Sequence, residues 1–186
     1  EFLDASPDLA SRTLAASYDV DRLLRRVDLL SASMEEALDS VALHEEFFLA
    51  RPSIRPVQSS EAWISSSFSR SRFHPVLLVN RPHPGVDISA AAGTPILATG
   101  KGVVLSAGNR SGYGKTVEID HGYGYRTLYA HAGALSVKKG QRVDRGDVLG
   151  EVGKTGLATA PHLHYEVLVN DRQVNPGSFM IDDRVH

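Results

Sequence analysis

The position of the glycines is the feature that most constrains the fold of this chain. All 16 glycines lie at Gly85 or later, so the first 84 of the 186 residues contain none. Charge divides in a similar way, with a net −7 over residues 1–50 and +5 over residues 51–186. A glycine-free segment is typical of a long helix, whereas short strands need frequent glycine turns. The chain is therefore predicted to be mainly β, with an α-helical segment ahead of the β domain.

The glycine-free half contains a heptad repeat. Apolar residues recur every seven positions at two places in the heptad, first Val20, Val27, Met34, Val41 and Phe48, and three positions later Leu23, Leu30, Ala37 and His44. This spacing predicts a long, coiled-coil-like helix over roughly 17–49. Its apolar face could pack on another chain, on a second helix or on the domain that follows. Because Ala37 and His44 lie within the repeat, any self-association is predicted to be weak.

Composition suggests four segments and excludes several classes of protein. We expect a helical segment at 1–50, a Pro-containing linker at 51–61, the β domain at 62–180 and a tail at 181–186. With no cysteine, disulfides and thiolate metal sites are excluded. No run approaches the ~20 apolar residues of a membrane span. Since the chain opens without a Met, we expect any export signal or membrane anchor to lie upstream. We expect no nucleic-acid partner.

The second half contains many short β-type runs separated by glycine turns. The runs at 115–120 and 125–130 flank His121-Gly122-Tyr123-Gly124, which predicts a hairpin with His121 in its turn. Because no helical segment separates the strands, we expect an antiparallel β-sandwich or a partly open barrel.

The last of these strands carries a His-x-His pair. Side chains alternate across a strand, so His162, His164 and Glu166 share one face. The opposite face, with Leu163, Tyr165 and Val167, is apolar and is predicted to face the core. Two imidazoles about 7 Å apart on one face can serve one metal site. Glu166 could orient His164 or be a surface carboxylate, and the pair alone could equally face solvent.

Two further elements supply ligand-type side chains. His83 and Asp87 lie four residues apart around a Pro-Gly turn, which can bring the two side chains together. Imidazole nitrogen and carboxylate oxygen suit zinc. His131 ends the run that begins at Leu128. Two histidines and one aspartate would leave a zinc ion with an open position for water, which is typical of catalytic sites, and would free two histidines for proton transfer.

These elements together resemble the lysostaphin-type (LytM) zinc metallopeptidases, which are bacterial cell-wall endopeptidases. The resemblance runs from about Trp63 to Phe179 and rests on four motifs, Arg81-Pro82-His83-Pro84-Gly85-Val86-Asp87-Ile88, Gly93-Thr94-Pro95, Leu128-Tyr129-Ala130-His131 and Thr155-Gly156 through Pro161-His162-Leu163-His164-Tyr165-Glu166-Val167. It implies a β core with a groove whose floor holds the metal.

The resemblance also implies a role for each residue of the site. His83, Asp87 and His164 match the ligands of one zinc ion per chain, and His131 and His162 match the two catalytic histidines. The implied activity is hydrolysis of peptide bonds in peptidoglycan stem or cross-bridge peptides by an exported protein of the periplasm or cell envelope. The chain departs from the family at Val76-Leu77-Leu78-Val79, where a more polar turn is expected, so its substrate preference stays open.

Two other functions compete with hydrolysis. Some members of the family only activate other wall hydrolases, and in such a protein the N-terminal helix would be the working part. Alternatively, the repeated Val-x-x-Gly pattern at 137–150 resembles lipoyl-like β modules attached to coiled coils. Such modules need none of the five site residues, so metal analysis distinguishes them.

Overall fold

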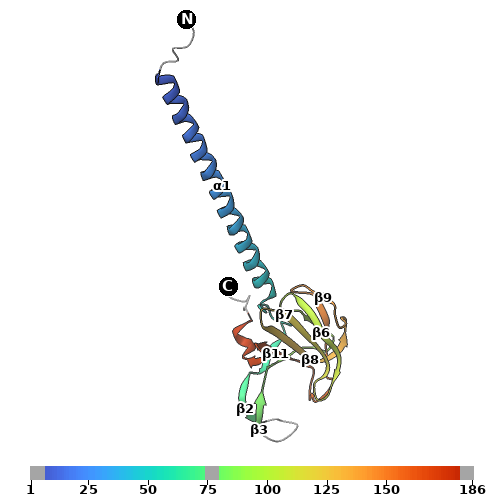
Figure 1. The fold of residues 1–186 in the computed structure, drawn as a ribbon. Coiled ribbons are helices and arrows are strands. Elements are labelled where there is room, and N and C mark those ends of the chain that lie inside the picture. The colour runs from blue at the N-terminus through green and yellow to red at the C-terminus, as the bar shows by residue number, and fades with distance from the viewer. Residues whose placement is uncertain (1–6, 74–79, 181–186) are drawn as a thin grey trace. The chain divides into compact units, whose positions relative to one another are not determined.

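The structure is a computed structural model that describes residues 7–73 and 80–180 (Figure 1). It divides into two compact units between Glu46 and Phe47. The first unit contains all but the last turn of helix α1, which spans Pro7–Ala50 and is longer than the helix predicted from the heptads. Along the described chain, no helix combines the length and apolar content of a membrane span. The residues at 76–79 and the predicted tail at 181–186 lie outside the described part.

After the last turn of α1, the described residues of the second unit form twelve strands and a short 3-10 helix. The strands are β1 Trp63–Ser66, β2 Ser69–Phe73, β3 Asn80–His83, β4 Val86–Ser89, β5 Pro95–Leu97, β6 Gly102–Arg110, β7 Gly114–Gly122, β8 Tyr125–Leu135, β9 Arg142–Val143, β10 Val148–Val152, β11 His162–Val169 and β12 Arg172–Val174, and the 3-10 helix is η1 Pro176–Ser178. Ten strands form one antiparallel sheet in the order β1-β4-β11-β8-β7-β6-β9, with β10, β5 and β12 at its sides. Strands β2 and β3 form a separate pair.

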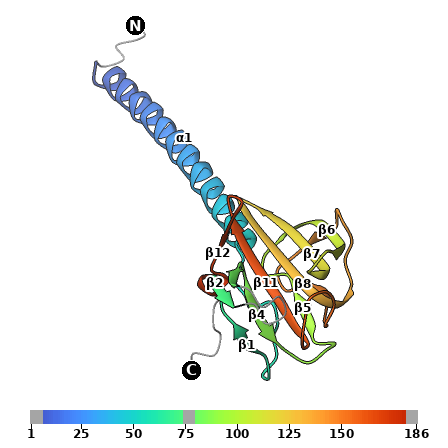
Figure 2. The same cartoon turned by 90° about the horizontal axis from the view of Figure 1, so that it is seen from below.

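The large sheet confirms the predicted mainly β class. It is antiparallel and is not closed into a barrel, and β4, β11, β8 and β7 lie side by side in Figure 2. Leu163, Tyr165 and Val167 of β11 are fully buried in the core, as the alternation predicts. Tyr129 of β8 packs against Tyr165 with ring centroids 5.3 Å apart. The apolar face of β11 thus fixes the strand on the core and sends its histidines to the other side.

The last turn of α1 belongs to the second unit. The Arg145 guanidinium donates to the carbonyl oxygens of Phe48, Leu49 and Arg51, and the Lys101 amide donates to the Leu49 carbonyl over 2.8 Å. These donors satisfy carbonyls that a helix end leaves unpaired. Arg51 precedes Pro52, which disfavours further helix. The helix therefore ends inside the β unit.

Residues 51–61, predicted to be a linker, also lie in the second unit. Val57 is fully buried, and the Leu97 amide donates to the Pro56 carbonyl over 2.8 Å. The prediction for His121 is wrong: it lies in β7 and is 5% exposed, and the turn of the hairpin consists of Tyr123 and Gly124. One of its ring nitrogens donates to the Lys101 carbonyl, which draws the side chain inward.

Candidate metal centre

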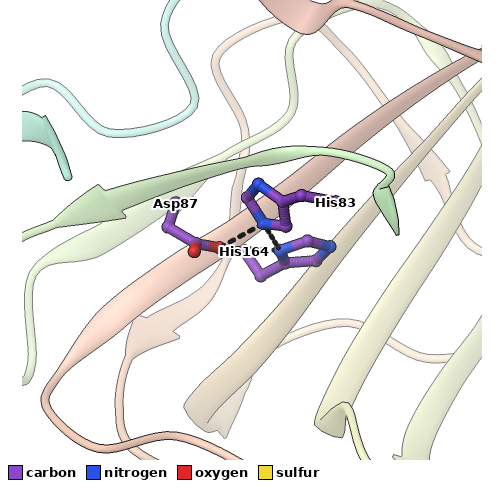
Figure 3. A group of neighbouring side chains, drawn as sticks. All are labelled: His83, Asp87 and His164. Atoms are coloured by element: carbon purple, nitrogen blue, oxygen red, sulfur yellow. Dashed lines mark hydrogen bonds and ion pairs between the residues drawn. The ribbon is translucent and has the colours of Figure 1, made fainter. Parts of the chain in front are cut away.

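Three ligand-type side chains converge between β3, β4 and β11. Figure 3 shows His83, Asp87 and His164 pointing toward one another. His83 Nε2 lies 3.1 Å from Asp87 Oδ1 and 3.2 Å from His164 Nδ1, and His164 Nδ1 lies 2.7 Å from Asp87 Oδ1. Both histidines are buried, and Asp87 is partly open. Among the described residues, this is the group of His, Asp and Glu side chains that could hold a metal ion.

Backbone geometry explains why these residues meet. Strands β4 and β11 pair so that Asp87 and His164 are direct neighbours. His83 is brought back over them by the turn at Pro84 and Gly85. A Cβ atom on Gly85 would lie 2.3 Å from the Tyr165 carbonyl oxygen, so only glycine allows the turn to approach β11 this closely.

The second ring nitrogen of each histidine bonds to an oxygen acceptor. His83 Nδ1 lies 2.8 Å from the Ser67 carbonyl oxygen, and His164 Nε2 lies 3.0 Å from Glu166 Oε1. Since these oxygens accept hydrogen bonds, the ring protons are assigned to those nitrogens. In the neutral rings, His83 Nε2 and His164 Nδ1 then direct lone pairs at each other and at the Asp87 carboxylate. Three acceptors without a proton between them form a site for a cation.

The donor set fits zinc. A tetrahedral zinc ion with bonds of about 2.0–2.1 Å holds its ligands about 3.4 Å apart. The two separations from His83 Nε2 are close to this value, at 3.1 and 3.2 Å, and the 2.7 Å between Asp87 Oδ1 and His164 Nδ1 would have to widen. Two nitrogens and one carboxylate oxygen are ligand types that zinc accepts, and a three-residue set is typical of its catalytic sites. The residues present therefore fit the ion that the sequence predicts.

Glu166 completes a carboxylate–histidine pair behind the site. It is 2% exposed, and its Oε1 also accepts from the Tyr113 hydroxyl over 2.9 Å. The Gln173 side chain donates to Oε2 over 3.3 Å. Burial raises the pKa of Glu166, but hydrogen bonds from His164, Tyr113 and Gln173 outweigh it and the pKa is lowered. An ionised Glu166 that fixes the His164 ring is the usual arrangement behind a metal-binding histidine.

Electrostatics favour a positive charge at this point. Burial raises the pKa of Asp87, but its contacts with His164 and His83 more than offset this and lower the pKa. Burial lowers the pKa of His164, yet Asp87 and Glu166 together raise it to about 8. Two carboxylates thus flank one imidazole, an environment that suits a proton or a metal cation.

His131 lies beside the three residues and has a strained backbone. Its φ is 62°, in the left-handed region that non-glycine residues seldom adopt. Lys115 pairs with Ala132 while Val117 pairs with Tyr129, so β8 carries one extra residue at this bulge. His131 Nδ1 lies 2.7 Å from the Thr155 carbonyl oxygen, which leaves Nε2 without a proton. Such strain often marks functional positions.

His162 lies beside His131. The two ring centroids are 4.8 Å apart, and His162 Nε2 lies 3.9 Å from Asp87 Oδ1. His162 Nδ1 lies 2.8 Å from the Ala160 carbonyl oxygen, so this ring also presents an unprotonated Nε2. Burial lowers the pKa of His131 to about 4, although the Thr155 carbonyl opposes the shift. All five residues named from the sequence are therefore brought together, and their individual roles stay predictions.

Sequence reasoning did not find Tyr113, Gln173 or Thr155. Tyr113 reaches Glu166 from the turn before β7 and Gln173 reaches it from β12, while Thr155 comes from the loop after β10. Tyr113 and Gln173 lie in no recognisable motif, and Thr155 lies in the last motif quoted above but was given no role. Their proximity depends on how distant strands pair, which a single sequence does not reveal.

Comparison with known proteins places this site in a family. Residues 81–176 match the family described as Peptidase family M23, the LytM-type peptidases. The DD-carboxypeptidase/endopeptidase Mpg of Neisseria meningitidis is 48% identical over 115 residues, which are 62% of this chain and 26% of that protein. The peptidoglycan DD-endopeptidase ShyA of Vibrio cholerae is 46% identical over 121 residues, covering 64% and 28% of the two chains.

A solved structure agrees with these sequence matches. A zinc-containing peptidase from Vibrio cholerae has a TM-score of 0.64 and 37% identity, covering 71% of this chain and 40% of that one. The chain thus spans about a quarter of the length of the two relatives it matches. The resemblance read from the motifs is confirmed.

Proposed function

The chain belongs to peptidase family M23, and from this premise we propose that it is a zinc-dependent endopeptidase that hydrolyses peptide bonds in peptidoglycan stem or cross-bridge peptides. The observation that carries the proposal is the convergence of His83, Asp87 and His164, with His131 and His162 beside them. Peptidoglycan and zinc appear in the names of the matched proteins, which supports the same substrate class and ion here. Since peptidoglycan lies outside the cytoplasmic membrane, the proposal requires an exported chain of the periplasm or cell envelope.

In this proposal, His83 Nε2, Asp87 and His164 Nδ1 hold one zinc ion. When bound, zinc acidifies a coordinated water and polarises the scissile carbonyl group. Glu166 keeps the proton of His164 on Nε2 and so keeps Nδ1 free for the metal.

The other two histidines move protons. His131 is neutral near pH 7, because its pKa is lowered to about 4, and its Nε2 accepts the proton of the attacking water. His162 is the more open of the two, with a side chain 16% exposed, and, when its ring carries a second proton at Nε2, it delivers that proton to the leaving amine beside Asp87. The carbonyls of Thr155 and Ala160 accept from Nδ1 of the two rings, so proton uptake and release take place at Nε2 of each ring.

Digestion of purified peptidoglycan tests the proposal. The zinc-loaded chain should release fragments with new amine ends, identified by mass spectrometry, and their position names the scissile bond. Removal of zinc with a chelator should stop the release, and added zinc should restore it. If the zinc-loaded chain leaves peptidoglycan intact and its metal site is full, the hydrolase proposal is wrong.

A second candidate is activation of another wall hydrolase. It is favoured by the apolar side chains that α1 exposes, such as Leu23, Val27 and Leu30, which could contact a partner. In that case a wall hydrolase would become more active when this chain is added, and the stimulation would persist in a His131→Ala variant. If instead the chain digests peptidoglycan without any other hydrolase, and His131→Ala abolishes this digestion, the chain is itself the hydrolase.

A further inference from the structure

Helix α1 exposes a continuous apolar row along the first unit. We define the α1 seam as Val20, Leu23, Val27, Leu30, Met34, Ala37, Val41 and His44. Its Val, Leu and Met side chains are 54–66% exposed. Exposed apolar side chains at this spacing are stabilised by a second helix, and a single helix in water gains little from propensity alone. The seam therefore needs a partner.

We propose that this partner is α1 of a second copy of the chain, paired in antiparallel orientation. In an antiparallel pair, the first apolar position of each heptad faces the second apolar position of the other helix. The register that sets Leu30 opposite Met34 of the partner copy then sets Val27 opposite Ala37, Leu23 opposite Val41 and Val20 opposite His44. One register thus aligns all eight seam residues with no gap.

Side-chain size favours the antiparallel over the parallel pair. A parallel pair places each residue opposite the same residue of the partner helix. Ala37 then meets Ala37 and leaves unfilled space in the interface, and His44 meets His44 and places two polar rings there. The antiparallel register sets a valine against each of these residues. Small residues matched to larger ones fill a helix interface better than like pairs do. Ala37 and His44, which predict weak self-association, therefore each face a valine in the antiparallel pair.

The leucines beside the seam also favour the antiparallel pair. Leu24 and Leu38 widen the seam on one side and are 57% and 60% exposed. In the antiparallel register, Leu24 faces Leu38 of the partner copy, and the contact occurs twice because the pair is symmetric. In a parallel pair, Leu24 and Leu38 would instead face Asp19 and Ser33 of the partner helix. Only the antiparallel pair buries these leucines against apolar groups.

Charge distribution along α1 is also complementary in this orientation. Residues 27–50 contain six acidic residues and no basic residue, whereas Arg22, Arg25 and Arg26 form a basic turn just before them. The antiparallel register sets this basic turn level with residues 38–42 of the partner copy, which lie within its acidic half and contain one acidic residue, Asp39. A parallel pair would align the two acidic halves, which repel each other. The two Phe47 residues, where the second units begin, would be separated by about 45 Å of helix.

Cysteine cross-linking of the full chain tests the orientation, because the natural sequence has no cysteine. A mixture of V20C and H44C chains should form the V20C–H44C disulfide on mild oxidation, and neither variant alone should cross-link. In the proposed register two Val20 positions lie about 36 Å apart along the axis. As a control, R25C and D39C are level with each other but on the outer face, and their mixture should not cross-link. Disulfides within the V20C variant alone would show a parallel pair and overturn the proposal.

Solution mass tests the pairing itself. The wild-type chain should have the mass of two chains by sedimentation equilibrium, and Val27→Asp, which places a charge in the seam, should reduce it to one. Ala32→Asp adds the same charge on the outer face of α1 and should leave the dimer intact. A wild-type chain that is monomeric at every loading concentration, or a dimer that Val27→Asp does not affect, would overturn the proposal. These readouts do not depend on hydrolysis of peptidoglycan.

Discussion

Asp87 and His164 are direct neighbours across β4 and β11, and Asp87 Oδ1 lies 2.7 Å from His164 Nδ1. The strand register thus builds two of the three ligand positions, and neither depends on a flexible loop. The remaining ligand, His83, is only four residues from Asp87, across a turn that Gly85 holds against β11. A site of this kind is rigid, so the effect of each side chain can be tested by substitution without rebuilding the fold.

Removal of one ligand should empty the site. We expect one zinc per chain in the wild type after dialysis against metal-free buffer, and a small residual fraction in Asp87→Ala and His164→Ala, because two ligands bind zinc poorly. Elemental analysis by mass spectrometry measures the metal content. His44→Ala, in the exposed part of α1, is the matched control and should keep its zinc. Full occupancy in either ligand variant would refute the assignment.

Loss of the buried carboxylate should weaken the site without removing a ligand. Glu166→Gln removes the negative charge that accepts from His164 Nε2, and we expect zinc affinity to fall about 10–100-fold. Tyr113→Phe removes one donor to Glu166 and should have a smaller effect. Competition with a coloured chelator measures the affinity, and circular dichroism checks the fold. An affinity unchanged in Glu166→Gln would mean that Glu166 has a packing role only.

The two remaining histidines should affect turnover and not metal content. His131→Ala and His162→Ala are each expected to lower the rate about 10²–10⁴-fold, the usual contribution of general acid–base catalysis, while zinc stays at one per chain. The rate of amine release from peptidoglycan and the zinc content are measured on the same samples. If either variant contains no zinc, that histidine is a metal ligand and the ligand and catalytic assignments have to be exchanged. If the rate falls by less than about tenfold, that histidine has no catalytic role.

Stability should fall at acidic pH through His121. Burial lowers its pKa from 6.5 in the folded chain, although the Lys101 carbonyl opposes the shift, so the unfolded chain binds the proton first as pH falls. The stabilisation is complete above pH 6.5 and declines below it, with a slope approaching about 1.4 kcal/mol per pH unit. Urea unfolding of wild type and His121→Asn, both with chelator, should show a steeper loss between pH 7 and pH 5 for the wild type. Equal slopes would contradict this assignment.

The end of α1 should matter for the stability of the β unit. A fragment of residues 47–186 keeps all the carbonyls that Arg145 and Lys101 bind, whereas a fragment of residues 51–186 lacks those of Phe48 and Leu49 and the buried Ala50. We expect the longer fragment to unfold at a higher urea concentration and to retain zinc binding and hydrolysis. If both fragments unfold at the same concentration, the last turn of α1 contributes nothing to this unit.

Local patterns allowed part of the site to be predicted from the sequence. Alternation along β11 placed His162, His164 and Glu166 on one face, and the four-residue spacing at the Pro-Gly turn joined His83 to Asp87. Both are short-range features, and the structure shows the geometry that they imply. The local patterns did not distinguish His164 from His162, and the prediction that His164 is the metal ligand required the family resemblance.

The parts that sequence did not reveal depend on long-range pairing. Tyr113 meets Glu166, and Arg145 meets the end of α1, across 53 and up to 97 positions of the chain. His121 looked like a turn residue because two glycines follow it closely, yet a carbonyl in a distant segment draws it into the interior. Contacts of this kind are set by sheet register and core packing, for which one sequence holds no direct signal.

Each of the four histidine rings at the site bonds to an oxygen atom of the protein, and these bonds affect how the enzyme would take up its metal. Ser67, Glu166, Thr155 and Ala160 belong to the fold, so the rings keep their orientation whether or not an ion is bound. Folding and loading become separate events, and the zinc-bound fraction then follows the free zinc concentration around the protein by simple mass action. Wall cleavage by such a protein would rise and fall with zinc supply, as a sensor does, without any additional regulatory element.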